Sequence, residues 1–374
     1  MENLDVLVQG TGAVGMALAL ALSRQGLSVG WSAAQGAPAA GSGGDVRAYA
    51  LNSASRTLLT ELKVWDALPL DAVTPVDDMH IEGDQAGAAL DFSAWRQGAD
   101  ALAWIVDAAE LDNALRTALR FAPHVQPTTP DCHPTLTALA EGRDSAARQS
   151  RGVAFARHAY GHAALAARLV ASAPHANVAR QWFRAPDVLA LLPFDRPAPG
   201  ASYGLVWSLP TAQAQALLDA PVAEFEVALN HACGGADGAV GTLRLDGERA
   251  AWPLATAQAD PVCGPGWVLL GDAAHLVHPL AGQGLNLGLA DVAALSRVIA
   301  AREPWRALGD ETLLRRYARE RAGPNRAMGL VTDTLLHLFA TEQPLLRELR
   351  NRGMTLLNHL SPIKRALIAR AMDA

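Results

Sequence analysis

The chain has 374 residues, of which 50% are hydrophobic and 18% are charged, and its formal net charge is −6. This composition supplies enough apolar side chains for a sizeable core, and the length predicts two domains or one large domain with an insertion. The net negative charge argues against general nucleic-acid binding, and no apolar run is long enough to cross a membrane as a helix. The first residues lack the pattern of a secretory signal, and Cys132, Cys233 and Cys263 form no disulfide or metal pattern, so we expect a cytoplasmic location.

A glycine-rich turn lies near the start of the chain, between a predicted strand and a predicted helix. An apolar run at residues 4–9 is followed by Gly10-Thr-Gly12-Ala-Val-Gly15 and then by apolar residues 16–22. This order is typical of a dinucleotide fingerprint, in which the first glycine makes the tight turn, the second admits the pyrophosphate and the third allows helix–strand packing. The three glycines are therefore predicted to bind a dinucleotide cofactor.

The fingerprint lacks one expected group. A carboxylate should end the second strand, predicted at residues 27–31, and bind the ribose hydroxyls of the cofactor. No Asp or Glu occurs between Asp5 and Asp45, and Ser32 is the nearest polar substitute. Either other groups hold the ribose or the cofactor binds less tightly.

The middle of the chain contains a β-rich region flanked by mixed segments. Residues 79–92 predict a hairpin, and residues 103–106 predict a strand that leads into a helix with Leu111, Leu115 and Leu119 at helical spacing. A Pro-rich stretch at 121–134 precedes a predicted strand at 136–140. From residue 158 to 260, short apolar strands alternate with turns; the expected strands are 163–170, 178–183, 188–192, 203–209, 240–245 and 250–254, with a helix at 224–232.

The most informative stretch begins at residue 267. An apolar run at residues 267–270 predicts a short buried strand that ends at Gly271-Asp272, and Gly282-Gln283-Gly284 then opens an apolar, helix-like segment through residue 299. Asp272 can accept hydrogen bonds from a sugar-alcohol chain, and free N–H groups at the helix start can hold an electron-rich ligand. The two glycines leave room for a flat ligand to approach the backbone.

This stretch resembles the ribityl-binding motif of the FAD-dependent aromatic hydroxylases, the class A flavin monooxygenases. Its second part, from His278 to Gly288, is most similar to the ubiquinone-biosynthesis branch of that family. Asp45-Val-Arg47 resembles a second element of these enzymes, in which the arginine lies against the flavin. Residues 141–148 resemble a third element, which contacts FAD and the nicotinamide cofactor, although Glu141 stands in place of the usual Asp.

The resemblance implies an α/β fold: a Rossmann-like FAD-binding domain of the GR2 type, interrupted by a mostly β substrate domain and followed by a helical C-terminus. The FAD-binding domain is expected at residues 1–75, 98–157 and 261–305. The substrate domain is expected to contain the hairpin at 76–97 and residues 158–260. Residues 306–374 are expected to form C-terminal helices, one of which carries Tyr317 and Arg321 and packs on the cofactor domain.

The same resemblance implies roles for individual residues. Pro279 is expected near the reacting edge of the flavin, and the backbone from Gly282 to Asn286 is expected to face its pyrimidine edge. His275 and His278 are candidates for acid–base chemistry, but a structural role is favoured for both, because the oxygen transfer needs no histidine. No metal site is expected. The predicted catalytic residues are Pro279, Gly282 and His278; the predicted cofactor-binding residues are Gly10, Gly12, Gly15, Arg47, Glu141, Gly142, Asp272, Gln283, Gly284, Leu285 and Asn286.

The activity implied is that of an NAD(P)H-dependent monooxygenase. In such enzymes NAD(P)H reduces FAD, the reduced flavin captures O2 at its C4a carbon, and the hydroperoxide delivers one oxygen to an aromatic ring, here a prenylated phenol precursor of ubiquinone. Two alternatives stay open. One is a flavin reductase or dehydrogenase that acts on an isoprenoid double bond. The other is a scaffold of a quinone-biosynthesis complex with weak FAD binding, which the missing ribose carboxylate, Ala108 and Glu141 favour.

The implied substrate is lipophilic, so it must be collected from a bilayer surface or from a partner protein, such as a member of a ubiquinone-biosynthesis complex. From Leu345 onward, basic and apolar side chains are interleaved. A helix of this kind can lie on the anionic inner face of a membrane, and it can equally pack on the FAD-binding domain with a solvated basic face. Peripheral membrane contact is therefore one of two expectations for this end, and no nucleic-acid partner is expected.

Overall fold

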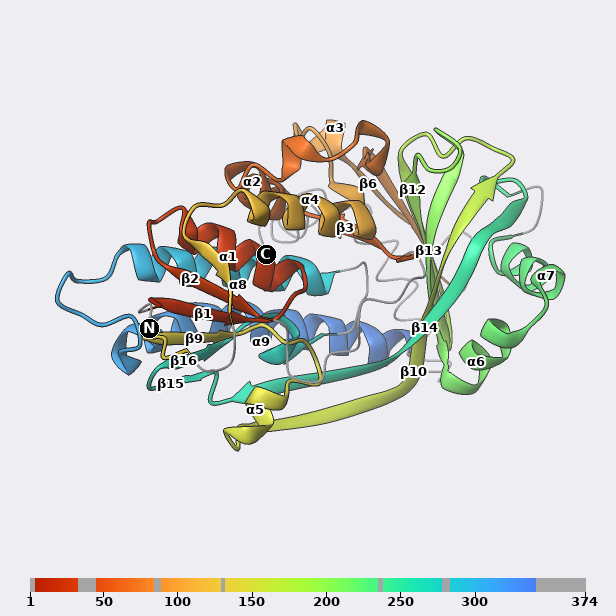
Figure 1. The fold of residues 1–374 in the computed structure, drawn as a ribbon. Coiled ribbons are helices and arrows are strands. Elements are labelled where there is room, and N and C mark those ends of the chain that lie inside the picture. Colours follow the sequence, from red (N-terminus) through yellow and green to blue (C-terminus); the bar gives the residue numbers. More distant parts are fainter. Residues whose placement is uncertain are drawn as a thin grey trace.

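The computed structural model describes residues 4–32, 45–83, 89–128, 132–234, 238–277 and 283–340 (Figure 1). Within these ranges the helices are α1 Ala13–Ser23, α2 Ser53–Glu61, α3 Ala94–Gln97, α4 Ala108–Arg120, α5 Ala146–Ser150, α6 Thr211–Asp219, α7 Val222–Ala232, α8 Gln283–Ala300 and α9 Glu311–Ala340, with short 3-10 turns at Trp65–Ala67, Leu70–Ala72 and Gly271–Ala273. None of these helices is long and apolar enough to cross a membrane.

A six-stranded sheet forms the first layer of the described structure. Its order is β15 (Cys263–Gly264), β16 (Trp267–Leu269), β9 (Leu136–Leu139), β1 (Val6–Gln9), β2 (Val29–Ser32) and β8 (Val125–Pro127). The five strands from β16 to β8 run parallel, and only β15 is antiparallel to its neighbour. The carboxyl ends of β16, β9 and β1 therefore lie side by side at one edge of this sheet, which is where open α/β sheets bind their ligands.

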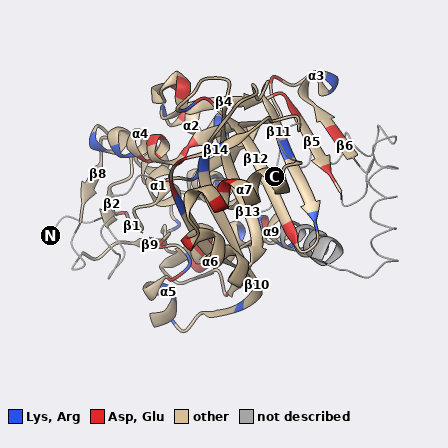
Figure 2. Ribbon diagram, turned by 90° about the vertical axis from the view of Figure 1, so that its right-hand side faces the viewer, with Lys and Arg blue, Asp and Glu red and all other residues tan. Residues whose placement is uncertain are grey.

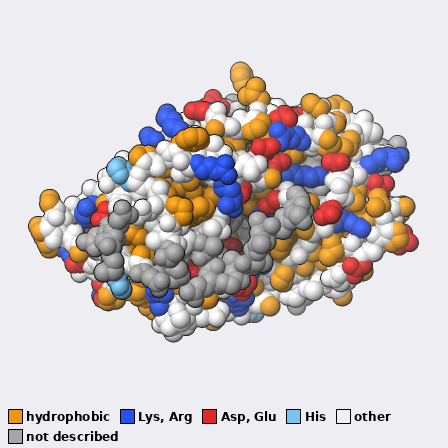
Figure 3. Space-filling view, viewed as in Figure 1, with side chains coloured by type: hydrophobic (Ala, Val, Ile, Leu, Met, Phe, Trp, Pro, Cys, Tyr) orange, Lys and Arg blue, Asp and Glu red, His pale blue; other side chains and the backbone are white. Residues whose placement is uncertain are grey.

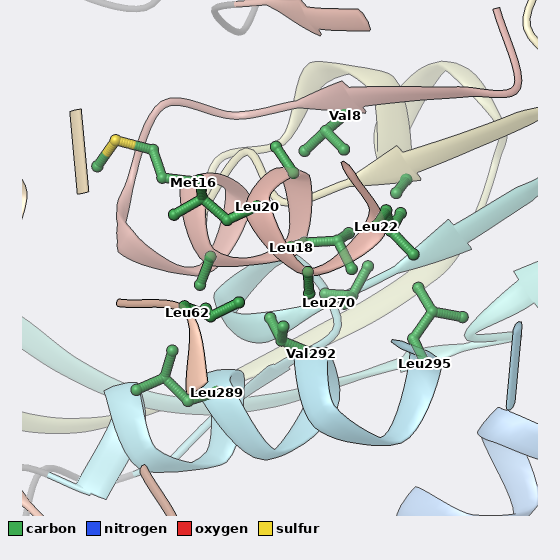
Figure 4. Close-up of a cluster of buried hydrophobic side chains, with 14 of the residues drawn as sticks. Val8, Met16, Leu18, Leu20, Leu22, Leu62, Leu270, Leu289, Val292 and Leu295 are labelled. Atoms are coloured by element: carbon green, nitrogen blue, oxygen red, sulfur yellow. The ribbon is translucent and has the colours of Figure 1, made fainter. Parts of the chain in front are cut away.

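The core of this layer lies between the sheet and the helices α1 and α8. Figure 4 shows Leu18 and Leu22 of α1 close to Val292 and Leu295 of α8, with Leu270 after β16 beside them. These leucine and valine side chains are almost fully excluded from solvent. Each buried side chain of this size contributes about 1.5–3 kcal/mol to stability, so the apolar face of α8 holds the helix start at the carboxyl edge of the sheet.

An eight-stranded sheet forms the second layer. Its order is β17 (His275–Leu276), β14 (Leu243–Asp260), β10 (Ala154–Ala171), β13 (Ser202–Pro210), β12 (Asp187–Phe194), β11 (Val178–Arg184), β5 (Asp78–Glu82) and β6 (Ala89–Ser93). Its neighbouring strands are antiparallel, except that β11 and β5 are parallel. The helices α6 and α7 cover one face of this sheet (Figure 2), through a cluster that includes Leu165, Trp207, Phe225 and Leu229.

A small third sheet connects the two layers. It consists of β3 (Ala48–Leu51), β7 (Ala103–Asp107) and β4 (Val73–Val76), all antiparallel. The long pair of β10 and β14 also runs from the region beside the six-stranded sheet into the eight-stranded one (Figure 1). On the outside, positive and negative side chains are interspersed over the face shown in Figure 3.

The structure confirms the predicted fold class and corrects several element boundaries. The two strands expected at 240–245 and 250–254 are one continuous strand, β14, because the turn-like Asp246 and Gly247 are accommodated at a shift in register with β10. The strand expected at 163–170 begins earlier, at Ala154, because its first residues pair with the end of β14. The Pro-rich stretch contains β8, which pairs with β2, and the sequence pattern does not predict α6. The predicted domain boundaries stay a prediction, and residues 341–374 lie outside the described structure.

The turn after β1 depends on two close backbone approaches. Gly10 has a φ of +136°, and a Cβ there would overlap the carbonyl oxygen of Ala140. A Cβ at Gly15 would overlap the carbonyl oxygen of Gly10. Gly12 differs, because a Cβ there would meet nothing within 4 Å, and its φ is −80°.

We therefore expect Gly15→Ala to lower the free energy of unfolding by about 1–3 kcal/mol, since the backbone must shift to admit the methyl group. Gly12→Ala is the matched control and should stay within about 0.5 kcal/mol of wild type, as expected for a substitution that disturbs no packing. Denaturant unfolding of the two variants measures this difference. Equal losses in both would contradict the close packing of the turn.

Candidate cofactor site

Three loops meet at the carboxyl ends of β1, β9 and β16. The Gly10–Gly15 turn follows β1, the loop beginning at Ala140 follows β9, and the Gly271–Ala273 turn follows β16. Val14 at the start of α1 packs 3.3 Å from the position of a Cβ on Gly271. The structure therefore brings together three sequence motifs that are far apart in the chain, at the carboxyl edge where open parallel sheets bind their ligands.

The start of α1 lies at this edge of the sheet. Gly12 is its N-cap, and among the described residues no side chain is recorded as capping the first N–H groups. Within the same residues, no heavy atom outside the adjacent chain lies within 4 Å of the position that a Cβ on Gly12 would occupy. Uncapped N–H groups and open space at a helix N-terminus suit a phosphate, so the turn has the form that a dinucleotide pyrophosphate requires.

Asp272 places a carboxylate at the same edge. Its side chain is half-buried, and among the residues that the structure describes none donates a hydrogen bond to it. Burial raises the pKa of the Asp272 carboxyl above its ordinary value, and the positive charges of Arg143, His275 and Arg47 oppose this rise. A half-buried carboxylate without a donor has unused capacity to accept hydrogen bonds from the hydroxyls of a bound sugar alcohol.

A second, fully buried carboxylate holds the Asp272 turn in place. Asp291 of α8 accepts hydrogen bonds from the Gly271 N–H at 2.9 Å and from Nε2 of His275 at 2.7 Å, both on Oδ2. Its Oδ1 accepts from Nε of Arg321 at 2.7 Å. Tyr317, one turn before Arg321 on α9, donates to the Leu269 carbonyl at 3.0 Å. These bonds fix the turn against both helices and occupy Nε2 of His275, in agreement with the structural role expected for it.

The loop after β9 uses its own polar groups to close on itself. Oε2 of Glu141 accepts from the Ser145 hydroxyl at 2.6 Å and from the Ala147 N–H at 3.0 Å. Ser145 then caps α5 by accepting from the Arg148 N–H. Buried Arg148 donates to the carbonyl of Ala273 at 3.0 Å, so this loop docks directly on the Asp272 turn. One carboxylate oxygen of Glu141 is thus committed to loop structure, and Gly142 beside it has a φ of +78° and open space.

Arg47 lies at the start of β3, where the first layer faces the second. Its guanidinium makes a bidentate ion pair with Asp45, at 2.8 Å and 2.6 Å, and lies over the rings of Tyr49 and Trp252. The hydrogen bond to Asp45 raises the pKa of Arg47, and nearby Asp272 adds to the effect. The side chain is still 47% exposed, so part of this cation is accessible to solvent.

The start of α8 is fixed by the side chain of Asn286, whose backbone is predicted to face the flavin. Oδ1 of Asn286 accepts from the Asn52 N–H at 3.1 Å and from the Ser55 hydroxyl at 2.8 Å, while its Nδ2 donates to the Ala50 carbonyl at 2.8 Å. The side chain therefore ties α8 to β3 and α2. The backbone of Gln283, Gly284 and Leu285 forms the first turn of the helix.

The structure does not describe every predicted site residue. His278, Pro279 and Gly282 lie outside the described residues, so the predicted catalytic positions stay predictions. Asp291 is a residue that the sequence reasoning missed. A single acidic residue inside the apolar helix pattern of 283–299 was the signal that could have revealed it, since a buried carboxylate requires partners. In the described part of the chain no cluster of His, Cys, Asp or Glu is arranged to hold a metal ion.

Comparison with known proteins agrees with this geometry. The family described as "FAD binding domain" matches residues 126–332. The chain is 30% identical to 3-demethoxyubiquinol 3-hydroxylase of Escherichia coli K12, over 98% of each chain. It is 29% identical to ubiquinone hydroxylase UbiL of Rhodospirillum rubrum, over 98% of this chain and 89% of that protein. The structure of p-nitrophenol 4-monooxygenase PnpA from Pseudomonas putida DLL-E4 has the same fold, with a TM-score of 0.77, 17% identity and coverage of 100% and 99%. These matches confirm FAD as the predicted cofactor.

The hydrogen bonds around Asp291 make the stability of the fold depend on pH. Burial disfavours a charged His275, but the charge of Asp291 and the hydrogen bond to it prevail and raise the pKa of His275 above 6.5. Burial likewise disfavours a charged Asp291, but His275, Arg321 and the Gly271 N–H prevail and hold the pKa of Asp291 below 3.8. The stability contributed by the histidine is fully present below pH 6.5 and is lost as the pH rises through its raised pKa. The stability contributed by the aspartate is present above pH 3.8 and is lost as the pH falls through its lowered pKa.

We therefore expect the midpoint temperature of wild type to fall as the pH rises above about 6.5 and through the raised pKa of His275. The variant His275→Gln keeps an N–H donor at the Nε2 position that faces Asp291 but cannot titrate, so its midpoint should fall less over the same range. Thermal unfolding of both proteins across this range measures the difference. Parallel curves would show that His275 is not charged in the folded protein.

Proposed function

We propose a specific reaction for this chain, which belongs to the family of FAD-dependent aromatic hydroxylases: it inserts one atom of O2 into the aromatic ring of a lipophilic ubiquinone precursor, with NAD(P)H as reductant. The observation that carries the proposal is the Asp272 turn, which holds a half-buried carboxylate without a donor among the described residues beside the open turn at Gly12. The near full-length similarity to two ubiquinone hydroxylases supports the class of substrate.

The residues of this chain would bind and orient the cofactor. FAD, when bound, supplies the reduction and oxygen-activation chemistry. The uncapped start of α1 would bind the pyrophosphate, and Asp272 would accept hydrogen bonds from the ribityl hydroxyls. The N–H groups in the first turn of α8 would favour negative charge at the pyrimidine edge, and Arg47 would add a cation nearby. Residues 141–148 would act mainly by holding the Asp272 turn, because Arg148 donates to the Ala273 carbonyl and Glu141 closes the loop that carries Arg148.

The eight-stranded sheet has an apolar face on the side away from α6 and α7. Leu165 packs toward α6 and α7, so by strand alternation Ala164 and Ala166 lie on the opposite face, and Ala190 and Val206 lie on that face in neighbouring strands. Val206 packs with Ile105 of the connecting sheet, so this face points toward the cofactor layer. We propose that the ring of the substrate lies along this face, which would suit a phenol with an apolar tail.

The cofactor assignment predicts the effect of Asp272→Asn. The variant loses a charged acceptor, so the affinity for FAD should fall roughly ten- to hundredfold, corresponding to about 1.5–3 kcal/mol for a hydrogen bond to a charged group. Titration of the apoprotein with FAD, followed by flavin fluorescence, measures the affinity. Asp219→Asn is the control, because Asp219 is exposed at the end of α6, outside the cofactor motifs, and accepts from the side chain of Gln215. An unchanged affinity in Asp272→Asn would contradict the role of Asp272.

Oxygen uptake coupled to a hydroxylated product separates the proposed reaction from a reductase. A colourless protein that does not take up FAD would instead favour a scaffold. Both outcomes can be read from one preparation, by its flavin absorbance and by mass analysis of the products formed from a prenylated phenol with NADH or NADPH.

We also propose peripheral contact with an anionic membrane surface, through which the substrate would be collected. The support is the sequence from Leu345 onward, in which basic residues exceed acidic ones and alternate with apolar side chains; the basic residues are Arg347, Arg350, Arg352, Lys364, Arg365 and Arg370, and the acidic ones are Glu348 and Asp373.

Wild type should therefore sediment with anionic vesicles at low salt and release at high salt, because the attraction is screened. A variant with Lys364, Arg365 and Arg370 changed to Gln should bind these vesicles less. Neutral vesicles are the control. Equal sedimentation of both proteins would show that these basic residues do not mediate membrane binding, and it would favour delivery of the substrate by a partner protein.

A further inference from the structure

Arg168 is a buried arginine in the middle of β10, far in sequence from Arg47 and from the glycine-rich turns of the cofactor site. Its side chain is only 10% exposed and lies over the ring of Phe194 at 4.0 Å. Its Nη2 donates a hydrogen bond to the carbonyl oxygen of Arg47 at 2.6 Å and another to Oδ2 of Asp107 at 3.2 Å. One guanidinium thus connects the eight-stranded sheet to the start of β3 and the end of β7 in the small third sheet.

The carbonyl of Arg47 is held from two directions. It accepts from Arg168 of the eight-stranded sheet and, at 3.3 Å, from the N–H of Ala108 at the start of α4. Asp107 contributes as well, because its Oδ1 caps α4 by accepting from Ala109 and Glu110 while its Oδ2 accepts from Arg168. The carbonyl of Arg47 is therefore fixed by groups other than Asp45, which accepts from both the N–H and the side chain of Arg47.

Burying the Arg168 guanidinium is unfavourable if its only role is to stabilise the fold. Burial lowers the pKa of the Arg168 guanidinium, and within the described residues its Nη1 is buried without a hydrogen-bond partner. Buried ion pairs often contribute no more stability than well-packed apolar side chains of similar volume. A bond network that converges on one carbonyl is better explained by the position that it imposes on Arg47 than by stability.

We propose that Arg168 is a positioning residue: it fixes the start of β3 from the eight-stranded sheet and so sets where the Arg47 cation lies at the FAD site. The inference rests on the proposed function, in which Arg47 lies beside the flavin. A displacement of β10 would reach the Arg47 carbonyl directly through the Arg168 hydrogen bond and indirectly through Asp107 and the start of α4. The occupancy of the proposed substrate face and the environment of the flavin are thereby coupled.

The chain offers a matched control in Arg249 of β14. Arg249 is opposite Ala167, the neighbour of Arg168, so the two arginines lie on opposite faces of the same sheet. Arg249 also donates two hydrogen bonds to carbonyl oxygens, those of Leu217 and Ala220, each at 2.6 Å, and it lies over the ring of Phe225. It differs in that these partners belong to the α6 side, away from the cofactor layer.

The experiment compares Arg168→Gln, Arg168→Lys and Arg249→Gln as full-length proteins. Three quantities are measured: the dissociation constant for FAD by fluorescence titration of the apoprotein, the visible circular dichroism of the bound flavin, and the thermal midpoint. We expect Arg168→Gln to bind FAD about tenfold more weakly, the size expected when one charged hydrogen bond is lost, and to change the flavin dichroism. Arg168→Lys should be intermediate, because lysine keeps the charge but not the planar fork.

Arg249→Gln should lower the thermal midpoint but leave the FAD affinity and the dichroism of wild type. If Arg168→Gln fails to fold because Asp107 is left unpaired, the double variant Arg168→Gln/Asp107→Asn removes that charge, and an asparagine side chain can still cap α4. Equal effects of Arg168→Gln and Arg249→Gln on FAD, or no effect of either, would overturn the inference. If the wild type binds FAD, these outcomes contradict only the role of Arg168, and the proposed function stands. If the wild type binds no FAD, the role of Arg168 and the proposed function are both contradicted.

Discussion

The geometry of the cofactor site depends on one buried carboxylate, Asp291. A fully buried negative charge is unfavourable unless donors surround it, and here the donors come from three separate places: the turn after β16, the short strand that follows, and α9. Satisfying this one charge therefore fixes the Gly271 turn relative to two long helices. The position of the neighbouring residue, Asp272, is thereby fixed, although no described residue donates a hydrogen bond to its carboxylate.

The same logic separates motif residues that look alike in sequence. Glu141, Asn286 and Asp272 are all polar residues in glycine-rich motifs at the carboxyl edge of the sheet. In the structure Glu141 closes its own loop and Asn286 joins α8 to β3, whereas Asp272 has no donor in the part of the chain that the structure describes. Side chains that already have hydrogen-bond partners in the protein shape the site, whereas a side chain without such partners is available to a ligand. A sequence motif does not distinguish the two, because the distinction lies in which distant backbone groups come within reach.

The sequence predicted those parts of the fold that are set by local pattern. The turn at Gly10–Gly15, the hairpin of β5 and β6, and the helix from Gln283 each follow from spacing of apolar residues and glycines over short ranges. It did not predict β8, because three residues in a Pro-rich stretch become a strand only when β2 is beside them. Arg168 and Asp107 were missed for a similar reason: their contact spans 61 positions, and neither residue lies in a motif. Long-range partners of charged residues carry little local signal, although a lone charge within an apolar run, as at Asp291, is a usable hint.

The absence of an acidic residue at the end of β2 places greater weight on the preorganisation of the phosphate turn. Lost contacts with the ribose hydroxyls would weaken binding by about 0.5–1.5 kcal/mol for each neutral hydrogen bond and more for a charged one. The structure shows a contact that reduces the cost of ordering the turn. Trp31, on β2 itself, donates its indole N–H to the Gly10 carbonyl at 3.0 Å, while the Gly10 N–H donates to the Ser32 carbonyl. The strand that lacks the carboxylate thus holds the turn through both polar groups of Gly10. A turn that is already rigid loses little entropy when a pyrophosphate binds, so part of the affinity lost at the ribose can be regained at the phosphate.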